Sequence, residues 1–251
     1  MKLSGRAAIV TGASQGIGFA VAEKLVDDGC AVVIADIRDA VEAASRLAGR
    51  AGPAIGLPLD VTSEDQVAAV VAETVARFGS VDILVNNAAI ASELVPAPFE
   101  ESTPAQWRRI LDVNVVGTFL MCRAVAPHMR ARQWGRIVNV GSGTAFKGLP
   151  GLAHYVASKG AIIMLTRTLA NELGGDNVLV NVVSPGFTIT EAVRGNPRIL
   201  DTFGPKAIAT RAIKREARPI DVANVIHFFV SEEAGFVTGQ NLAADGGSVF
   251  H

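Results

Sequence analysis

Short runs rich in Val and Ile alternate with longer segments of helical character from residue 6 to about residue 185. The runs are almost continuously apolar, which is typical of parallel strands covered by helices on both faces. This alternation predicts an α/β fold of three layers, with a doubly wound parallel sheet and right-handed crossovers. The predicted strands are 7–11, 31–36, 54–60, 81–86, 135–142 and 178–185, with a last strand in 239–247.

The helical segments carry signals at their ends. Ser63 and Thr103 are each followed three residues later by glutamine, which is the pattern of a capping box. Gly29 and Gly79 stand where two helices should end. No linker, low-complexity tract or internal repeat divides the sequence, so we expect a single domain over residues 1–251.

The alternation stops at residues 187–218, where Gly, Pro and charged residues are scattered without a clear period. We expect an irregular segment here, and an irregular segment of this length inside a compact domain is usually a lid or a binding loop. Helical character returns at 219–233. The sequence therefore predicts a substrate lid at about 187–218.

Charge and composition narrow the partners. Lys and Arg total 23 against 24 Asp and Glu, so no positive excess favours nucleic acid or an anionic membrane. The amino-terminal apolar run is too short for a signal peptide, and no stretch of 18 apolar residues is evident, so we expect a cytoplasmic protein. Cys30 and Cys122 lie in apolar surroundings with no His or second Cys close by, and we expect both to be buried, reduced thiols.

A glycine-rich turn, "TGASQGIG" at 11–18, joins the first strand to the first helix. In a dinucleotide-binding turn, the glycines allow a tight bend and a close approach of the backbone to the pyrophosphate, which faces the helix N-terminus. Ser14 and Gln15 would supply further donors. The alternative is an ordinary strand-to-helix turn that happens to be rich in glycine, and the strand–turn–helix context favours the dinucleotide site.

Asp36 ends the second strand, 18 residues after Gly18. A carboxylate at this place can accept hydrogen bonds from the adenosine ribose hydroxyls and would repel a 2′-phosphate. Arg38 would offset part of that repulsion, but Gln15 brings no positive charge to the turn. The sequence therefore favours NAD over NADP.

With these motifs, the whole chain resembles the short-chain dehydrogenase/reductase family. The matching stretches are "TGASQGIG" (11–18), "DV" (60–61), "NNAA" (86–89), Asn114 in "LDVNVVGTF", Ser142 in "NVGSG", "YVASK" (155–159), "PGFTIT" (185–190) and "TGQNLAADGG" (238–247). Two departures are mild: Ala89 stands in place of the usual glycine, and Gly141 in place of a common serine. Neither removes a proton-transfer group.

The resemblance implies a Rossmann fold of about seven strands and assembly as a homotetramer, with 104–131 and 153–173 as the interface helices. It also implies a small-molecule substrate. The residues that it assigns to cofactor binding are Gly12, Ser14, Gln15, Gly16, Ile17, Gly18, Asp36, Asp60, Val61, Asn87, Tyr155, Lys159, Pro185, Gly186, Thr188 and Thr190. Its catalytic residues would be Asn114, Ser142, Tyr155 and Lys159.

Tyr155 and Lys159 stand four residues apart, on one face of a predicted helix. A phenol must lose about 3 pKa units to exchange protons near pH 7, which requires about 4 kcal/mol. One ammonium about 4 Å away supplies about that much at an effective dielectric constant near 20. We therefore expect Lys159 to lower the pKa of Tyr155 and to hold the nicotinamide ribose, while Ser142 orients the substrate oxygen. By resemblance, Asn114 would position a water that links Lys159 to solvent.

Simpler interpretations of these residues stay open. A Tyr–Lys pair on a helix is usually a surface contact, and Asn114 could merely bridge backbone groups. His154 is expected to form a wall of the pocket rather than to act as a base. The four histidines share no ligand spacing, so no metal site is expected.

An apolar pocket is expected from Phe146, Leu149, Leu152, Phe187 and Phe203. The leading hypothesis is an NAD-dependent secondary-alcohol dehydrogenase or ketone reductase acting on an aryl, cyclic or medium alkyl substrate. The alternatives are a 3-oxoacyl-thioester reductase, for which Asp36 is awkward because such reductions commonly draw on NADPH, and an idle NAD-binding regulator. A surplus of basic residues could attract an anionic group or could simply be solvated: Lys147, Arg194, Arg198, Lys206, Arg211, Lys214, Arg215 and Arg218.

Overall fold

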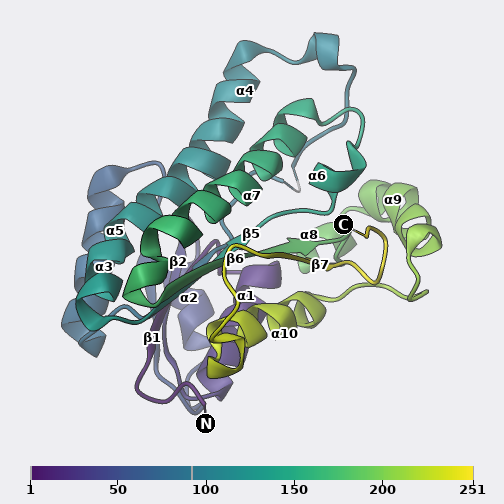
Figure 1. Cartoon of the computed structure of the whole chain (residues 1–251). Coiled ribbons are helices and arrows are strands. Elements are labelled where there is room, and N and C mark those ends of the chain that lie inside the picture. The colour runs from purple at the N-terminus through teal and green to yellow at the C-terminus, as the bar shows by residue number, and fades with distance from the viewer. Residues whose placement is uncertain (1, 92, 251) are drawn as a thin grey trace.

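A single seven-stranded parallel sheet forms the centre of the molecule (Figure 1), in the order β3-β2-β1-β4-β5-β6-β7. A computed structural model describes residues 2–91 and 93–250. The order reverses direction at β1 and β4, as in a doubly wound fold, and confirms the predicted architecture. The strands are β1 (Ala7–Thr11), β2 (Ala31–Asp36), β3 (Ala54–Pro58), β4 (Ile83–Asn86), β5 (Gly135–Val140), β6 (Val178–Pro185) and β7 (Asn241–Ala244).

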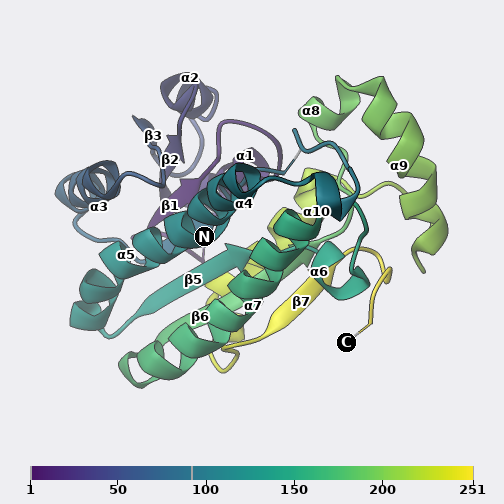
Figure 2. The same cartoon turned by 90° about the horizontal axis from the view of Figure 1, so that it is seen from above.

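Helices cover both faces of this sheet, and Figure 2 shows α7 and α5 on one face, running along the strands. One apolar core joins the sheet to α1, α2 and α10, and the other joins it to α3, α5 and α7. The helices are α1 (Gly16–Asp27), α2 (Ala40–Ser45), α3 (Glu64–Phe78), α4 (Pro104–Leu111), α5 (Thr118–Arg132), α6 (Thr144–Lys147), α7 (Ala153–Leu173), α8 (Glu191–Arg194), α9 (Pro197–Thr210) and α10 (Pro219–Val230).

Three predicted strands are shorter in the structure. The strands at 54–60 and 135–142 end at Pro58 and Val140, and the strand at 81–86 begins at Ile83. Asp60 and Ser142 were predicted to lie within two of these strands, but they follow the carboxyl ends of β3 and β5. In an open parallel sheet, ligands bind at these ends, so residues beyond the ladder line the crevice rather than the core.

The capping signals differ in outcome. Thr103 forms the full box with Gln106: its hydroxyl accepts the Gln106 N–H at 3.2 Å, and the Gln106 amide oxygen accepts the Thr103 N–H at 2.8 Å. Ser63 forms half of one, because the side chain of Gln66 accepts from the backbone of Asp60 instead. Gly79 caps the end of α3 with φ of 78°.

The expectation of an irregular segment at 187–218 is wrong, because α8 and α9 occupy much of it. Asn196 caps α9 through its side chain, and Pro197 takes the first helical position, where its missing N–H costs nothing. The proline therefore begins a helix rather than breaking one. In Figure 2 the two helices project beyond the end of the sheet.

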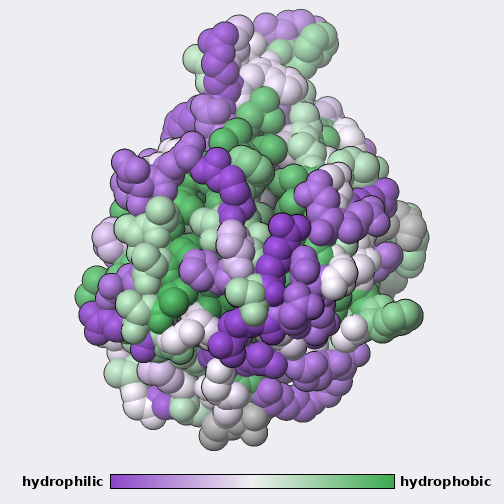
Figure 3. All heavy atoms as spheres, turned by 60° about the vertical axis from the view of Figure 1, so that its left-hand side comes forward, coloured by the Kyte–Doolittle hydropathy of each residue, from purple (hydrophilic) through white to green (hydrophobic). Residues whose placement is uncertain are grey.

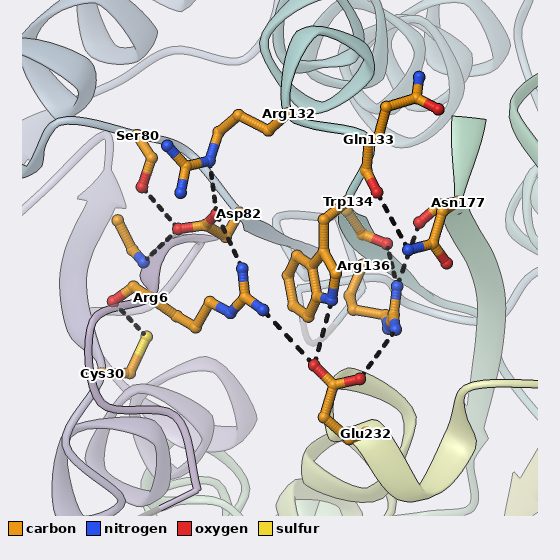
Figure 4. Close-up of polar contacts among 12 residues, drawn as sticks. Arg6, Cys30, Ser80, Asp82, Arg132, Gln133, Trp134, Arg136, Asn177 and Glu232 are labelled. Carbon is orange, nitrogen blue, oxygen red and sulfur yellow. Dashed lines mark hydrogen bonds and ion pairs between the residues drawn. The ribbon is translucent and has the colours of Figure 1, made fainter.

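A cluster of charged residues lies at the amino ends of the strands (Figure 4), whereas the glycine turn lies at their carboxyl ends. Asp82 directly precedes β4 and is fully buried. One of its oxygens accepts from the backbone of Ala7 at 2.9 Å and from Ser80 at 2.6 Å. The other lies 3.5 Å from Arg6 and 3.3 Å from Arg132. The charge is thus compensated on both sides, as a buried carboxylate requires.

Trp134 lies between two guanidinium groups in the same cluster (Figure 4). The guanidinium carbons (Cζ) of Arg6 and Arg136 lie 3.6 and 4.3 Å from the centroid of the Trp134 ring. Its indole N–H donates to Glu232 at 3.1 Å, and Arg136 donates to the backbone carbonyl of Asn177 at 3.2 Å. These contacts tie β1, β5 and β6 to the turn after α10, far from the strands' carboxyl ends.

The segment Pro104–Arg132 is long and apolar enough to cross a membrane by length and composition alone, contrary to the expectation that no such stretch exists. Its residues Met121, Cys122, Val125 and Met129 are buried in the core against the sheet. That packing is typical of a central helix in a globular domain. The face that carries α3, α4 and α5 is turned forward in Figure 3, which shows apolar side chains among polar ones.

Candidate active site

The glycine turn is as tight as the sequence suggests. Gly12 adopts a φ of +62°, and a Cβ there would stand 2.7 Å from the Cα of Ala88. A Cβ on Gly18 would stand 2.4 Å from the carbonyl oxygen of Gly12. The amide of Asn87 donates to the carbonyls of Thr11 at 3.1 Å and Gly12 at 2.8 Å, and so fixes the turn against the end of β4.

The N-terminus of α1 suits an anion. Gln15 occupies the N-cap without a side-chain cap bond, and no acidic residue stands among the described residues of the first turn. The N–H groups of this turn and the positive end of the helix dipole are therefore not neutralised by an acidic side chain of the helix itself. Thr190 closes the far side, because a Cβ on Gly16 would lie 3.2 Å from its methyl carbon. The cradle fits a dinucleotide's pyrophosphate.

Asp36 stands at the end of β2, beside the turn. Its carboxylate oxygens accept the backbone N–H of Ser14 at 3.0 Å and of Arg38 at 3.2 Å. The hydroxyl of Ser14 donates to the carbonyl of Arg38 at 2.6 Å. The side chain of Asp36 is thus fixed and only partly buried, and it presents a negative charge where the adenosine ribose of a dinucleotide would lie.

Other predicted cofactor residues lie just after β3 or in the first turn of α1. Asp60 accepts from the backbone and hydroxyl of Thr62, and Val61 packs against Gly117, where a Cβ would approach within 2.6 Å. Ile17 packs, partly buried, against the core of the α1 face. This residue anchors the helix.

A buried arginine forms a hydrogen bond with the loop after β6. Arg211 is 3% exposed and donates to the carbonyls of Phe187 and Arg215, each at 2.6 Å. Thr188 is also buried and donates to the carbonyl of Gly186 at 3.0 Å. With Pro185 at the end of β6, this loop borders the same crevice from the other side.

Tyr155 and Lys159 occupy the first turns of α7. The ammonium of Lys159 lies 5.8 Å from the centroid of the Tyr155 ring and donates to the carbonyl of Val140 at 2.8 Å. Ser142 follows Val140 at the end of β5, accepts from the hydroxyl of Thr144 at 2.9 Å and forms a hydrogen bond with the Tyr155 side chain. The predicted catalytic groups therefore converge on one place.

The predicted lowering of the Tyr155 pKa is wrong for the protein without ligand. Burial raises the pKa of Tyr155 above its ordinary value, and the hydrogen bond with Ser142 offsets only part of that rise. Burial also lowers the pKa of Lys159 to about 8. The ammonium is itself desolvated and directed at Val140, so its charge does not outweigh the burial of the phenol.

Asn114 lies in a π-helical turn, Asp112–Gly117, between α4 and α5. Its side chain accepts from the backbone of Ile90 at 2.8 Å and donates to the hydroxyl of Ser158 at 3.1 Å. Ser158 in turn donates to the carbonyl of Tyr155 at 2.7 Å. Sequence reasoning missed Ser158, although its place three residues after Tyr155, on the same helix, could have indicated it.

The basic residues of the lid are largely engaged within the chain. Besides buried Arg211, Arg215 pairs with Asp221 at 2.7 Å, and Arg194 pairs with Glu216 at 3.4 Å. Lys214 donates to the carbonyl of Ala209 at 2.8 Å. These contacts favour the interpretation of a self-paired surface over that of an anion site. The side chain of Arg198 lies outside the described residues.

Two of the aromatic residues expected to form the pocket lie next to each other. Phe187 and Phe203 lie with their centroids 6.2 Å apart, which joins the loop after β6 to α9. Cys30 and Cys122 are buried free thiols, as predicted, and burial raises the pKa of each to about 12. Among the described residues, no three His, Cys, Asp or Glu side chains form a group able to hold a metal; His251 lies outside them.

Comparisons with known proteins agree with this geometry. A family model described as enoyl-(acyl carrier protein) reductase matches residues 12–249. The chain is 36% identical to the 3-oxoacyl-(acyl-carrier-protein) reductase FabG of Thermotoga maritima, over 99% of this chain and 100% of that one. It is 40% identical to a cis-4-hydroxycyclohexanecarboxylate dehydrogenase of Sinomonas cyclohexanicum, over 96% of both.

A solved structure shares the whole architecture. A short-chain type dehydrogenase/reductase from Mycobacterium ulcerans superposes with a TM-score of 0.93 at 29% identity, covering 99% of this chain and 91% of that one. The relatives and the family model cover nearly the full length, and the glycine turn and the Ser142–Tyr155–Lys159 cluster stand where that fold binds its ligands. The chain therefore belongs to the short-chain dehydrogenase/reductase family of nicotinamide-dependent oxidoreductases.

Proposed function

We propose that this protein transfers a hydride between NAD and a secondary alcohol or ketone that carries an apolar substituent, which is an aryl, cyclic or medium alkyl group. The observation that carries the proposal is the convergence of Ser142, Tyr155 and Lys159 beside the crevice that the glycine turn opens. Hydride transfer at a carbon must be matched by proton transfer at its oxygen, and a tyrosine held by a serine can serve as the proton donor and acceptor.

Asp36 supports NAD as the cofactor. Its carboxylate is fixed by two backbone N–H groups and faces outward from the end of β2. A 2′-phosphate at this place would meet a like charge, whereas ribose hydroxyls would meet an acceptor. NAD, when bound, supplies the hydride acceptor; Gly12, Gly16 and the first turn of α1 would hold its pyrophosphate. The remaining binding contacts would come from Ser14, Gln15, Ile17, Gly18, Asp60, Val61, Asn87, Pro185, Gly186, Thr188 and Thr190.

In the oxidative direction, Tyr155 takes the proton from the substrate hydroxyl, and Ser142 orients that oxygen. Lys159 has a pKa of about 8, so it carries a substantial positive charge at neutral pH and can stabilise the phenolate. It would also hold the nicotinamide ribose. Asn114, fixed against Ile90 and Ser158, would position a water on the proton path from Lys159.

The substrate pocket would be closed by the lid at 187–218. Phe187 and Phe203 present an apolar wall that fits a ring or a medium alkyl group, and Phe146, Leu149 and Leu152 would complete it. The relative from Sinomonas cyclohexanicum is a cis-4-hydroxycyclohexanecarboxylate dehydrogenase; the hydroxylated ring in that name supports a cyclic alcohol, and the name also includes a carboxylate.

A 3-oxoacyl-thioester reductase is the second candidate. The similarity to the Thermotoga maritima protein favours it, at 36% identity over nearly the whole of both chains. The fixed carboxylate of Asp36 speaks against a 2′-phosphorylated cofactor, and the paired basic residues of the lid offer few free charges to an acidic carrier protein.

We further propose a cytoplasmic homotetramer built on α5 and α7. Phe119 and Met164 are 41% and 51% exposed on these helices, and Val116 is 43% exposed just before α5. A second copy would cover these apolar side chains. Light scattering of Phe119→Glu should show smaller particles than the native protein, whereas Val41→Glu on α2 should not change the mass.

A panel of aryl, cyclic and alkyl secondary alcohols tests the activity, with NADH absorbance followed at alkaline pH and each alcohol offered with NAD and with NADP. We expect turnover of cyclic or aryl alcohols with NAD. Preferential reduction of 3-oxoacyl thioesters with NADPH would favour the second candidate. Firm NAD binding without turnover of any compound would favour a regulator.

A further inference from the structure

The backbone N–H of Tyr155 is bound by the side chain of its neighbour. The Nδ1 atom of His154 accepts this N–H at 2.8 Å. Tyr155 is the third residue of α7, and the first backbone bond of the helix runs from Val156 to Leu152 at 2.9 Å. The N–H of Tyr155 thus belongs to the first turn, where the helix itself offers no acceptor.

No other cap serves this turn among the described residues. Leu152 occupies the N-cap and has no side chain that could accept a hydrogen bond. The chain enters α7 through Gly148 and Gly151, with φ of +58° and +83°, and the carbonyl of Gly151 accepts the N–H of Ala97 at 3.1 Å. His154 therefore supplies the side-chain acceptor for the N–H of the residue that carries the proposed proton-transfer group.

The imidazole of His154 is itself fixed. It is 8% exposed and meets the ring of Trp107 edge-on, with centroids 6.1 Å apart. Trp107 lies on α4 and donates its indole N–H to the hydroxyl of Ser102 at 3.1 Å. These contacts restrict the orientation of the His154 ring, so its Nδ1 atom stays directed at the N–H of Tyr155.

This contact fixes the tautomer of His154. An Nδ1 atom that accepts the N–H of Tyr155 carries no hydrogen, so the ring's hydrogen lies on Nε2. A cavity of about 40 Å³ adjoins His154, and Glu101 is the one charged residue among the described residues that line it. On α7 itself, the titratable neighbours are Tyr155 and Lys159.

We propose that His154 is a positioning residue: its unprotonated Nδ1 caps the first turn of α7 and thereby fixes the Tyr155 hydroxyl for proton transfer. The inference rests on the proposed function of Tyr155 and adds a role to a residue that the sequence suggested only as a pocket wall. Loss of the acceptor by substitution would lower kcat without weakening the binding of NADH.

The test compares His154→Asn with His154→Gln. The amide oxygen of asparagine can replace Nδ1, whereas that of glutamine reaches the place of Nε2. We expect kcat within about threefold of the native value for His154→Asn and a loss of about 10- to 100-fold for His154→Gln, since small displacements of reacting groups have effects of that size. The Kd of NADH should stay within about twofold in both.

Equal kcat values for the two variants would overturn the proposal. The two variants match in polarity, so a general loss of stability would lower the Tm and the kcat of both. If the native protein turns over no alcohol, the proposed function fails first. The positioning role then has a separate readout, because Tyr155 is the only tyrosine in the chain. With tyrosine labelled at ¹³Cζ, the chemical shift of the single Tyr155 resonance should change in His154→Gln and stay at its native value in His154→Asn. Equal chemical shifts in the two variants would overturn the positioning role.

Discussion

The ammonium of Lys159 lies 5.8 Å from the centre of the Tyr155 ring, yet its hydrogen bond goes to the carbonyl of Val140, at 2.8 Å. Both side chains are held at the carboxyl end of β5, next to Ser142. Burial raises the pKa of Tyr155 and lowers that of Lys159 to about 8. Each group is thus biased toward its neutral form.

The lowered pKa of Lys159 predicts a pH-dependent stability. Below pH 8 the folded protein bears the cost of a buried ammonium, and this cost disappears as the pH rises from 8 to 10.5, because the folded state releases the proton before the unfolded state does. Lys159→Met removes the cost. Its gain in unfolding free energy over the native protein should therefore shrink by about 2 kcal/mol between pH 7.5 and 9.5, measured by urea unfolding. Lys206→Met, on the exposed surface of α9, is the control and should show no such change.

Asp36 should decide between the two cofactors. Asp36→Asn removes the charge that would repel a 2′-phosphate, so the ratio of kcat/KM for NADP to that for NAD should rise about tenfold or more. Asp39→Asn removes the same charge three residues away, at a position with φ of 55° that asparagine tolerates. Steady-state kinetics with both cofactors measure the effect. An equal rise in the two variants would mean that only the overall charge matters.

Arg211 should matter for the lid through its hydrogen bonds rather than its charge. Arg211→Lys keeps the charge but cannot reach the carbonyls of both Phe187 and Arg215. We expect a lower Tm and a KM for the alcohol raised about tenfold. Arg194→Gln removes an exposed charge from the same lid and should leave KM unchanged. The reverse result would indicate that the lid attracts an anionic substrate.

Asp82 should affect stability and leave catalysis alone. Its carboxylate is buried among Arg6, Arg132 and Ser80, at the edge of the sheet opposite Tyr155. Asp82→Asn should lower the free energy of unfolding by about 1–3 kcal/mol, because the buried N–H of Ala7 and the hydroxyl of Ser80 lose a charged acceptor, while Arg6 and Arg132 are partly exposed to solvent. The native kcat should persist wherever the variant is folded. Glu93→Gln, which breaks an exposed pair with Arg109, should change stability little.

The fold and the assembly of the site were predictable from sequence because they depend on local patterns. Buried parallel strands are apolar runs, and the glycines at 12 and 18 are required by contacts that any Cβ would break. The topology then brings Ser142 and Tyr155 together, although they lie on different elements.

The sequence did not reveal effects that depend on the three-dimensional surroundings of a residue. The helix α9 was missed because Pro197 reads as a breaker until its place at the first helical position is known. The direction of the Tyr155 pKa was wrong because burial, which no local pattern measures, outweighs a nearby charge. The role of Arg211 was missed because a buried arginine looks, in sequence, like a surface one.

The central claim is that the hydroxyl of Tyr155 transfers the proton, and Tyr155→Phe tests it most directly. The variant keeps the ring and its packing and removes only the oxygen. With the best alcohol and saturating NAD, kcat should fall by about a thousandfold or more while the Kd of NADH stays within about twofold. A variant that retains more than a tenth of the native kcat would contradict the account.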